Sequence, residues 1–184
     1  MRKVIAVMNM SLDGYCDHTE MIADDEMHQH YTDLLNSADT CLYGRTTYQL
    51  MEDFWPILIR KPMGVKAMDD FAVAIDRISK VVFSHSLKNV SWKTARLAKH
   101  DIEEEIAEIR KQPGGNILVG SPGLIVSTTN LGLVDEYQIS VQPTIIGKGL
   151  PLFKNIQERI NLRWIKCKTF GCGAVTHYYE TKRD

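Results

Sequence analysis

The sequence has 184 residues, of which 44% are hydrophobic and 24% charged, and its formal net charge is -1. These values are typical of a soluble globular protein, and the length predicts one domain over residues 1–184 that buries its own core. The sequence contains no basic block for nucleic acid and no apolar run long enough for a membrane span. The apolar run before Asn9 is only about six residues long and an acidic residue follows at Asp13, so it is read as a first strand and not as a targeting segment. Together with the cysteine spacing described next, this favours a cytoplasmic protein.

Cysteine and histidine spacing argues against disulfides and metal. The four cysteines include no C-x-x-C pair, which favours a reduced protein over a disulfide scaffold. His28 and His30 are two residues apart and therefore point to different faces of a helix. Because neither H-E-x-x-H nor a Cys/His cluster occurs, we expect no metal site.

The first half of the chain alternates predicted strands and helices. Residues 2–8 are β-branched and apolar, as in a buried strand, and Asp13-Gly14 then marks a turn. The next elements are a helix over 24–35, a strand over 39–43, a helix starting over 46–51, an irregular segment from Trp55-Pro56, a helix over 67–75, a strand over 80–84 and a short strand over 90–92.

Residues 101–111 form the clearest amphipathic helix. Ile102, Ile106 and Ile109 recur at helical spacing and predict its buried face. The intervening acidic residues are read as a solvated face, made by Glu103, Glu104, Glu105 and Glu108. Pro113-Gly114-Gly115 ends this helix.

The second half continues the alternation and then changes character. The remaining elements are a strand over 117–119, a helix over 123–130, a strand over 136–141, and two strands over 160–168 and 174–181 joined by a turn at 170–173. This order predicts an α/β fold with a central, mostly parallel sheet, an antiparallel C-terminal hairpin and helices on both faces.

Three polar segments follow predicted strands: Gly44-Arg45-Thr46-Thr47, Ser84-His85-Ser86 and Gly120-Ser121-Pro122-Gly123. The first and third also begin helices, whose N-terminal amides bind phosphate, and an arginine adds a charge-assisted contact. Ligands gather at the carboxyl ends of parallel strands, so the three segments together favour a nucleotide site.

Each segment also has a plain structural reading. Taken alone, residues 44–47 favour the reading of Thr46 as an N-cap and Arg45 as a surface charge, and residues 120–123 are equally a simple turn. Polar side chains are also common in loops such as 84–86. Neither G-x-G-x-x-G nor G-K-[ST] occurs, so the ordinary dinucleotide and P-loop fingerprints are missing.

Together with Met10-Ser11-Leu12-Asp13-Gly14, residues 133–137 and residues 143–149, these segments resemble the dihydrofolate reductase-like superfamily in order and spacing. Within it, they resemble the C-terminal reductase domain of bifunctional riboflavin-biosynthesis deaminase/reductases. The zinc deaminase half is missing, because no H-x-E precedes a P-C-x-x-C. The resemblance therefore implies a stand-alone reductase module.

The resemblance implies that NADPH binds across the strand ends. By position it assigns the cofactor to Gly44, Arg45, Thr46, Thr47, Ser84, His85, Ser86, Gly120, Ser121, Pro122, Gly123, Leu124 and Ile125. Arg45 with the Ser84 segment would select the 2′-phosphate of NADPH, and the amides of Gly123, Leu124 and Ile125 would meet the pyrophosphate. The family also implies a homodimer.

The substrate side is less defined. The resemblance places residues 8–13 beside the nicotinamide, so Asp13 and Asn9 are candidates for substrate contact, and Asp13 is also the candidate catalytic residue. Turn chemistry favours the alternative that Asp13 is only a turn residue before Gly14. Trp55 and Met27 are further candidates, with ordinary core packing as their alternative. Where dihydrofolate reductases carry a substrate carboxylate on the first helix, the aligned region of this chain holds His28, with Asp24, Asp25 and Glu26 nearby and the register open. The proton donor is therefore unassigned.

The predicted activity is NADPH-dependent hydride transfer to a small heterocycle, similar to that of 5-amino-6-(5-phosphoribosylamino)uracil reductase. The cofactor supplies the hydride, and the protein aligns the reactants and excludes water. Two alternatives stay open: a reductase of a pterin, carbonyl or imine, and a nucleotide-binding module without turnover.

Overall fold

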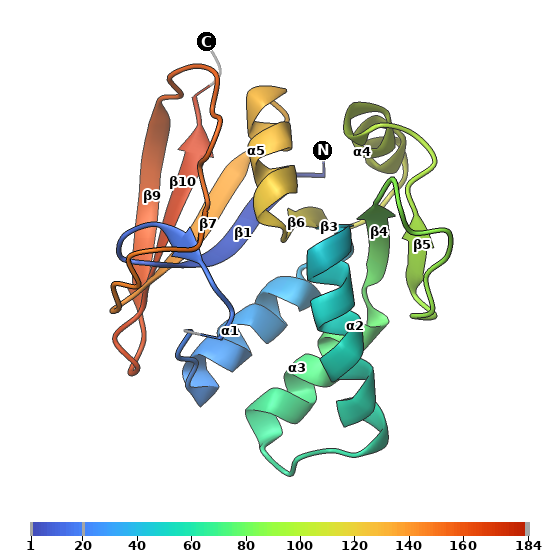
Figure 1. Ribbon diagram of the computed structural model, residues 1–184, viewed down its shortest axis with the longest axis vertical. Coiled ribbons are helices and arrows are strands. Elements are labelled where there is room, and N and C mark those ends of the chain that lie inside the picture. The colour runs from blue at the N-terminus through green and yellow to red at the C-terminus, as the bar shows by residue number, and fades with distance from the viewer. Residues whose placement is uncertain (1, 20, 183–184) are drawn as a thin grey trace. The chain divides into compact units, whose positions relative to one another are not determined.

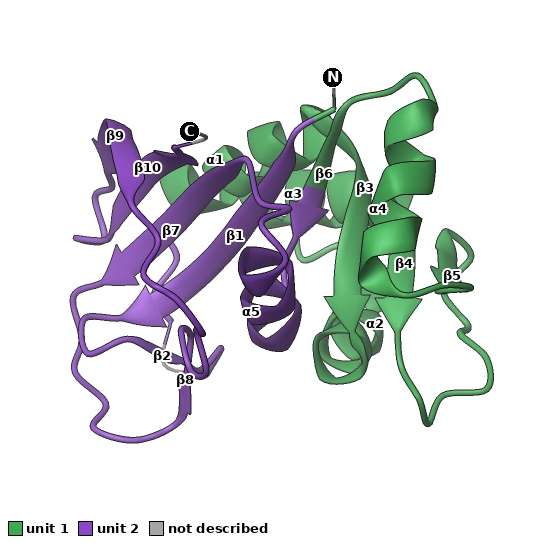
Figure 2. Ribbon diagram, turned by 90° about the horizontal axis from the view of Figure 1, so that it is seen from above, with its two compact units in different colours: residues 1–2, 25–117 green, residues 3–24, 118–184 purple. Residues whose placement is uncertain are grey.

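The computed structural model describes residues 2–19 and 21–182, and Figure 1 shows the predicted alternation of strands and helices. The chain divides into two compact units (Figure 2). Unit 1 contains Arg2 and residues 25–117, and unit 2 contains residues 3–24 and 118–182. Strand β6 (Asn116–Val119) begins in unit 1 and ends in unit 2.

Unit 1 carries four helices and three parallel strands. Its elements are α1 (Asp25–Asn36), β3 (Ala38–Gly44), α2 (Arg45–Arg60), α3 (Lys66–Arg77), β4 (Ser79–Phe83), β5 (Ala95–Leu97) and α4 (Ile102–Lys111). The strands lie in the order β5-β4-β3. Gly44 pairs with Phe83, so β3 and β4 end at the same level and release their following residues side by side.

The core of unit 1 forms because apolar helix faces pack on these strands. Leu42 and Val82 are fully buried, and Ile75 and Ile106 are 1% exposed. Helix α3 packs against α1 and α2. Helix α4 lies on the opposite face of the strands from α1 and α3 (Figures 1 and 2). The predicted buried stripe of α4 is confirmed for Ile106 and Ile109, and Asp101 caps this helix by accepting a 2.9 Å hydrogen bond from the Glu104 amide.

The irregular segment predicted from Trp55-Pro56 to beyond Gly64 starts too early, because α2 continues through Pro56 to Arg60 and only residues 61–65 are irregular. Proline removes one helical hydrogen bond and disfavours a helix interior by about 3 kcal/mol. Tertiary packing offsets this cost: Tyr48 and Leu58, on either side of Pro56, are 1% and 6% exposed. Because α2 buries both Tyr48 and Leu58, the helix continues through Pro56.

The prediction of a solvated glutamate face is wrong at one position, since Glu105 is 2% exposed. Its carboxylate accepts hydrogen bonds from Arg96 at 2.6 and 3.1 Å and from the Lys99 amide at 2.6 Å. Glu105 lies three residues after Ile102 and four before Ile109, which places it on the buried face of the helix. Its burial is possible because the neighbouring loop supplies donors.

The short strand predicted over residues 90–92 is wrong as well. Trp92 is buried, but its segment has no ladder partner, and the third strand of unit 1 forms at Ala95–Leu97. There Lys80 pairs with Ala95 and Val82 with Leu97 in parallel register. Trp92 fills the core beside the sheet instead of extending it.

Unit 2 contains a parallel strand pair and an antiparallel C-terminal hairpin. Its elements are β1 (Val4–Ser11), β2 (Tyr15–Cys16), α5 (Pro122–Asn130), β7 (Glu136–Gln142), β8 (Leu150–Pro151), β9 (Leu162–Thr169) and β10 (Val175–Thr181). Strand β1 runs parallel to β7, while β10 is antiparallel to both β7 and β9. The predicted hairpin is confirmed, and its turn closes with a 2.9 Å bond from the Gly173 amide to the Phe170 carbonyl.

The core of unit 2 consists of apolar side chains from its strands and from α5. Val4, Ile5, Ile125 and Tyr137 are each at most 3% exposed. The Thr129 hydroxyl of α5 lies 2.9 Å from the Tyr137 hydroxyl of β7, which satisfies both groups where they are buried. The four cysteines, all within the described ranges, are free thiols. Among the described residues, no helix is long and apolar enough to cross a membrane.

Candidate functional site

Two of the predicted cofactor segments meet where β3 and β4 end. Arg45 follows Gly44 and Ser84 follows Phe83, and the two strand residues are paired. The Arg45 guanidinium donates a hydrogen bond to the Ser86 hydroxyl at 3.3 Å. The prediction that these segments share one place in the fold is confirmed for this pair.

Ser84 shapes the turn that carries Ser86. Its hydroxyl oxygen accepts hydrogen bonds from the amides of Ser86 at 3.2 Å and Leu87 at 2.9 Å. A serine bonded to amides two and three residues later is a compact side-chain turn. The two hydroxyls then lie 3.5 Å apart. Ser86 and the intervening His85 are exposed to solvent.

Helix α2 begins directly at this cluster. Its N-cap is Gly44, which has no side chain to satisfy the first-turn amides. The alternative reading of Thr46 as the N-cap is therefore wrong; Thr46 is exposed within the first turn, beside Thr47. Uncapped helix N-termini present unsatisfied N–H groups and a partial positive charge. The guanidinium, two hydroxyls and this helix end form a set of donors suited to an anion.

A second contact, which the sequence analysis missed, holds the loop after β4 against the same helix. Tyr48 and Glu52 of α2 accept hydrogen bonds from the amides of Ser91 and Trp92 at 3.0 to 3.2 Å. The signal was present in the spacing, because Tyr48 and Glu52 lie three and seven residues after Arg45 and share its helix face.

The third predicted cofactor segment begins helix α5 in unit 2. Pro122 occupies the start of the helix and Ser121 is its N-cap, with no side-chain cap bond. The Ile125 amide donates to the Ser121 carbonyl at 2.9 Å, so the prediction that this amide meets a phosphate does not fit. Gly123 and Leu124 precede it in the first turn, where helical geometry leaves amides unpaired.

Within the described chain, no neighbouring atom requires position 123 to be glycine. A Cβ built there would meet no atom within 4 Å, and its φ angle is not positive. Neither packing nor backbone conformation therefore requires glycine. The absence of a side chain leaves the first turn of α5 open to close approach.

Asp13, the candidate for substrate contact, is bound by its own chain. Its carboxylate accepts hydrogen bonds from the Ser11 hydroxyl at 2.6 Å, the Gly147 amide at 2.7 Å and the Ile146 amide at 3.3 Å. The Ser11 hydrogen bond is the largest cause that lowers the pKa of Asp13, and the backbone bonds lower it further. Asp13 is therefore ionised at neutral pH and acts as an acceptor.

These bonds join two motifs that are more than 130 residues apart. The turn reading of Asp13-Gly14 is confirmed by a 2.9 Å bond from the Gly14 amide to the Ser11 carbonyl, with Gly14 at φ +86°. Strands β2 and β8, which the sequence analysis missed, pair next to this turn. Gly147 has φ +72°, a conformation that favours glycine. We call residues 11–16 with residues 142–151 the Asp13 loop pair.

The other predicted substrate residues have mixed surroundings. Asn9 is half-buried on β1 and pairs with Ser140 of β7. Met27 is 1% exposed, so its side chain belongs to the core and is not open to a ligand. Trp55 is half-buried, with its ring centroid 4.4 Å from that of Phe71, as expected for packing between α2 and α3.

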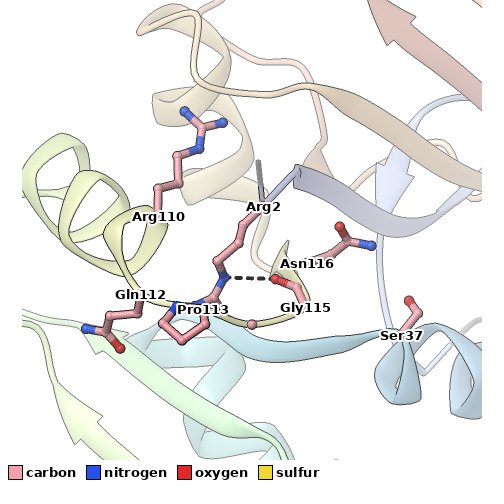
Figure 3. Close-up of a pocket in the computed structure, with 8 residues that line it drawn as sticks. Arg2, Ser37, Arg110, Gln112, Pro113, Gly115 and Asn116 are labelled. Carbon is pink, nitrogen blue, oxygen red and sulfur yellow. Dashed lines mark hydrogen bonds between the residues drawn. The ribbon is translucent and has the colours of Figure 1, made fainter.

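A cavity of about 360 Å³ in unit 1 contains none of the predicted site residues (Figure 3). Its wall includes Arg2, whose guanidinium donates to the Gly115 carbonyl at 2.8 Å, to the Ile109 carbonyl at 3.1 Å and to Asp39. Arg2 therefore joins the end of α4 to β3 and is engaged structurally. Among residues 2–19 and 21–182, no group of His, Cys, Asp or Glu is arranged to hold a metal ion.

Known proteins resemble this chain in sequence and in fold. The uncharacterized protein YyaP of Bacillus subtilis is 33% identical, over 97% of this chain and 94% of its own. A pyrimidine reductase-like protein of Corynebacterium diphtheriae shares the fold with a TM-score of 0.72 and 17% identity, over 100% of this chain and 93% of that one. Dihydrofolate reductase of Enterococcus faecalis, solved with NADP(H), has a TM-score of 0.63 and 13% identity, over 98% and 97%.

The predicted fold class is confirmed: the structure is a dihydrofolate reductase-like α/β three-layer fold with a mostly parallel sheet and antiparallel C-terminal strands. The model of the RibD C-terminal domain matches residues 2–176, nearly the whole chain. The protein therefore belongs to the RibD C-terminal domain family.

Proposed function

We propose that the protein is an NADPH-dependent reductase that transfers hydride to a small pyrimidine-like heterocycle. One observation carries the cofactor: Arg45 and Ser86 meet, with Ser84, at the uncapped N-terminus of α2. The fold is shared with a dihydrofolate reductase that binds NADP(H), and the family and a pyrimidine reductase-like relative support the substrate class.

The donor set fits the 2′-phosphate that distinguishes NADPH from NADH. A phosphate dianion offers only acceptors, and this cluster offers a guanidinium, two hydroxyls and first-turn amides. Arg45 is exposed, so its other N–H groups are accessible to a ligand. In unit 2, the amides of Gly123 and Leu124 would meet the pyrophosphate. When bound, NADPH supplies the hydride.

Asp13 has a supporting role in this proposal. A general acid must carry a proton at the working pH, and an aspartate with a lowered pKa does not. We assign Asp13 to ordering the loop pair beside the nicotinamide and substrate. No other proton donor is assigned within this loop pair, which keeps a nucleotide-binding module without turnover as the second candidate function.

We also propose a homodimer in the cytoplasm. Strand β9 ends the strand order of unit 2 and exposes Trp164 by 59% and Leu162 and Ile165 by 36% each. Apolar side chains on an edge strand favour a protein partner, and a second copy is the simplest. Sedimentation should therefore give a dimer for the wild type and a monomer for Trp164→Glu.

The function is tested in two steps. Saturating NADPH should raise the melting temperature, and NADH at equal concentration should raise it less. NADPH oxidation is then followed against a panel of aminopyrimidines, pterins and simple carbonyl compounds. Oxidation with the pyrimidines supports the proposal, and oxidation only with pterins or carbonyls assigns another substrate class. Binding without oxidation selects the second candidate function, while absence of any melting shift would overturn the cofactor assignment.

A further inference from the structure

One face of helix α2 contacts the loop after β4 at two points. We call residues 84–92 the β4 loop. Arg45, in the first turn of α2, meets Ser86 near the start of this loop. Tyr48 and Glu52 meet Ser91 and Trp92 at its end. Arg45 and Glu52 are seven residues apart, about 10 Å along the helix axis, so α2 spans the loop from end to end.

Glu52 is the centre of the second contact. Its Oε1 accepts hydrogen bonds from the Ser91 hydroxyl at 2.5 Å, the Ser91 amide at 3.2 Å, the Trp92 amide at 3.0 Å and the Tyr48 hydroxyl. Burial raises the pKa of Glu52, but these hydrogen bonds outweigh it and the pKa is lowered. An ionised carboxylate with four donors is a strong, charge-assisted anchor.

Trp92 makes this anchor rigid. It is 5% exposed, and its indole N–H donates to Asp76 of α3 at 2.7 Å. The Lys80 ammonium lies 3.9 Å from the centre of a Trp92 ring. The end of the β4 loop is thus fixed to α2, α3 and β4, while His85 and Ser86 near its start are exposed.

We propose that Glu52 is a positioning residue that sets the preference for NADPH over NADH. By holding the amides of Ser91 and Trp92, it fixes the span of the β4 loop so that Ser86 stays against Arg45. This inference rests on the proposed function, because the preference for NADPH over NADH that it explains depends on binding of the 2′-phosphate. Glu52 does not touch the phosphate itself and acts through the loop.

The test compares Glu52→Ala, Glu52→Gln and Tyr48→Phe with the control Asp53→Asn. Asp53 is the exposed neighbour of Glu52 on the same helix, so this control also removes a negative charge from α2. Dissociation constants for NADPH and NADH are measured by titration. Glu52→Ala should weaken NADPH binding roughly fivefold, which corresponds to losing the one neutral hydrogen bond that Ser86 contributes, and NADH binding less than twofold. Glu52→Gln keeps an acceptor oxygen and should lie between Glu52→Ala and the wild type.

A second readout needs no cofactor. Lys88 is exposed within the β4 loop, and trypsin cleaves after it faster when the loop opens locally. Glu52→Ala and Tyr48→Phe should be cut at Lys88 several times faster than the wild type, and Asp53→Asn at the wild-type rate. Arg45→Ala in the Glu52→Ala background should add less to the NADPH loss than it does alone, because both act on one contact.

The outcomes separate the two proposals. If the wild type binds neither cofactor, the proposed function fails, and unchanged cleavage at Lys88 overturns the anchoring on its own. If the wild type prefers NADPH and Glu52→Ala keeps that preference, only the present inference fails. Equal weakening of NADPH and NADH would assign Glu52 to general stability and would also overturn it. Should Glu52→Ala not fold, Glu52→Gln and Tyr48→Phe provide the test instead, through the ratio of the NADPH and NADH dissociation constants.

Discussion

The strand-end cluster of unit 1 and the Asp13 loop pair of unit 2 use polar residues in opposite ways. Arg45 presents a guanidinium with five N–H donors, and one of its hydrogen bonds goes to Ser86. Asp13 presents acceptors, and Ser11, Ile146 and Gly147 already occupy them. Exposed donors in excess mark a place for an anion, whereas a carboxylate that accepts three hydrogen bonds from its own chain marks a device that orders a loop.

Arg45→Ala should have the largest effect on the strand-end cluster of unit 1 and on its binding of NADPH. Losing a guanidinium contact to a phosphate costs about 1.5 to 3 kcal/mol, which corresponds to roughly 10- to 100-fold weaker NADPH binding. NADH lacks that phosphate, so its binding should change less than twofold. Titration of both cofactors measures the ratio, with Arg60→Ala at the far end of the same helix as control. Equal losses for both cofactors would remove Arg45 from the 2′-phosphate.

Asp13→Ala should act on the Asp13 loop pair of unit 2 instead. The amides of Gly147 and Ile146 would lose their acceptor and exchange hydrogen faster, which mass spectrometry detects. We expect the substrate KM to rise and the NADPH dissociation constant to stay within twofold. Lys148→Ala, an exposed change in the same loop pair, is the control.

The turnover number decides between the two roles of Asp13. Removing a general acid lowers kcat by about 10²- to 10⁴-fold. A residue that only orders the loop pair should lower it less than tenfold. A fall in kcat of a hundredfold or more in Asp13→Ala, at saturating substrate, would contradict the structural role.

Sequence patterns were sufficient for most elements because hydrophobic periodicity reflects burial directly. They failed where a distant segment changed the local balance. Pro56 stays inside α2 because side chains on both sides of it are buried, and Glu105 is buried because Arg96 and the Lys99 amide satisfy it. Both are cases in which tertiary contacts override a local preference.

The candidate site shows the same limit. The contact between Arg45 and Ser86 was predictable, because each residue follows a strand of a parallel pair. The bond from Asp13 to Gly147 was not, because no local pattern links residues more than 130 positions apart. Glu52 lay between these cases: its helical spacing from Arg45 was visible, but its partners at the end of the β4 loop were not.

Ser86→Ala should weaken NADPH binding less than Arg45→Ala does. The hydroxyl contributes a neutral hydrogen bond of about 1 kcal/mol, so NADPH binding should weaken roughly fivefold, with NADH unchanged. Ser84→Ala should cost more, since Ser84 also holds the turn through the amides of Ser86 and Leu87. If Ser86→Ala weakened NADPH more than Arg45→Ala, the cluster would have to be reassigned around the hydroxyls.

The smallest expected effect is the acid response of the Asp13 loop pair. The pKa of Asp13 is lowered below 3.8, mainly by Ser11. A depressed acid stabilises the folded loop above its ordinary pKa, and this stability is lost as pH falls through the folded value. An NMR titration of the carboxyl should therefore show a midpoint below 3.8 and little change between pH 5 and 7. A midpoint at or above 3.8, the ordinary aspartate value, would contradict these hydrogen bonds.

The cofactor assignment depends most directly on the 2′-phosphate, which can be isolated with small probes. Adenosine 2′,5′-bisphosphate and 5′-AMP differ by that phosphate alone, and calorimetry gives the dissociation constant of each. We predict that the wild type binds the bisphosphate at least tenfold more tightly than 5′-AMP. Arg45→Ala should bring the two affinities within about twofold of each other. Equal affinities in the wild type, or a preference that survives Arg45→Ala, would contradict the assignment of this cluster to NADPH.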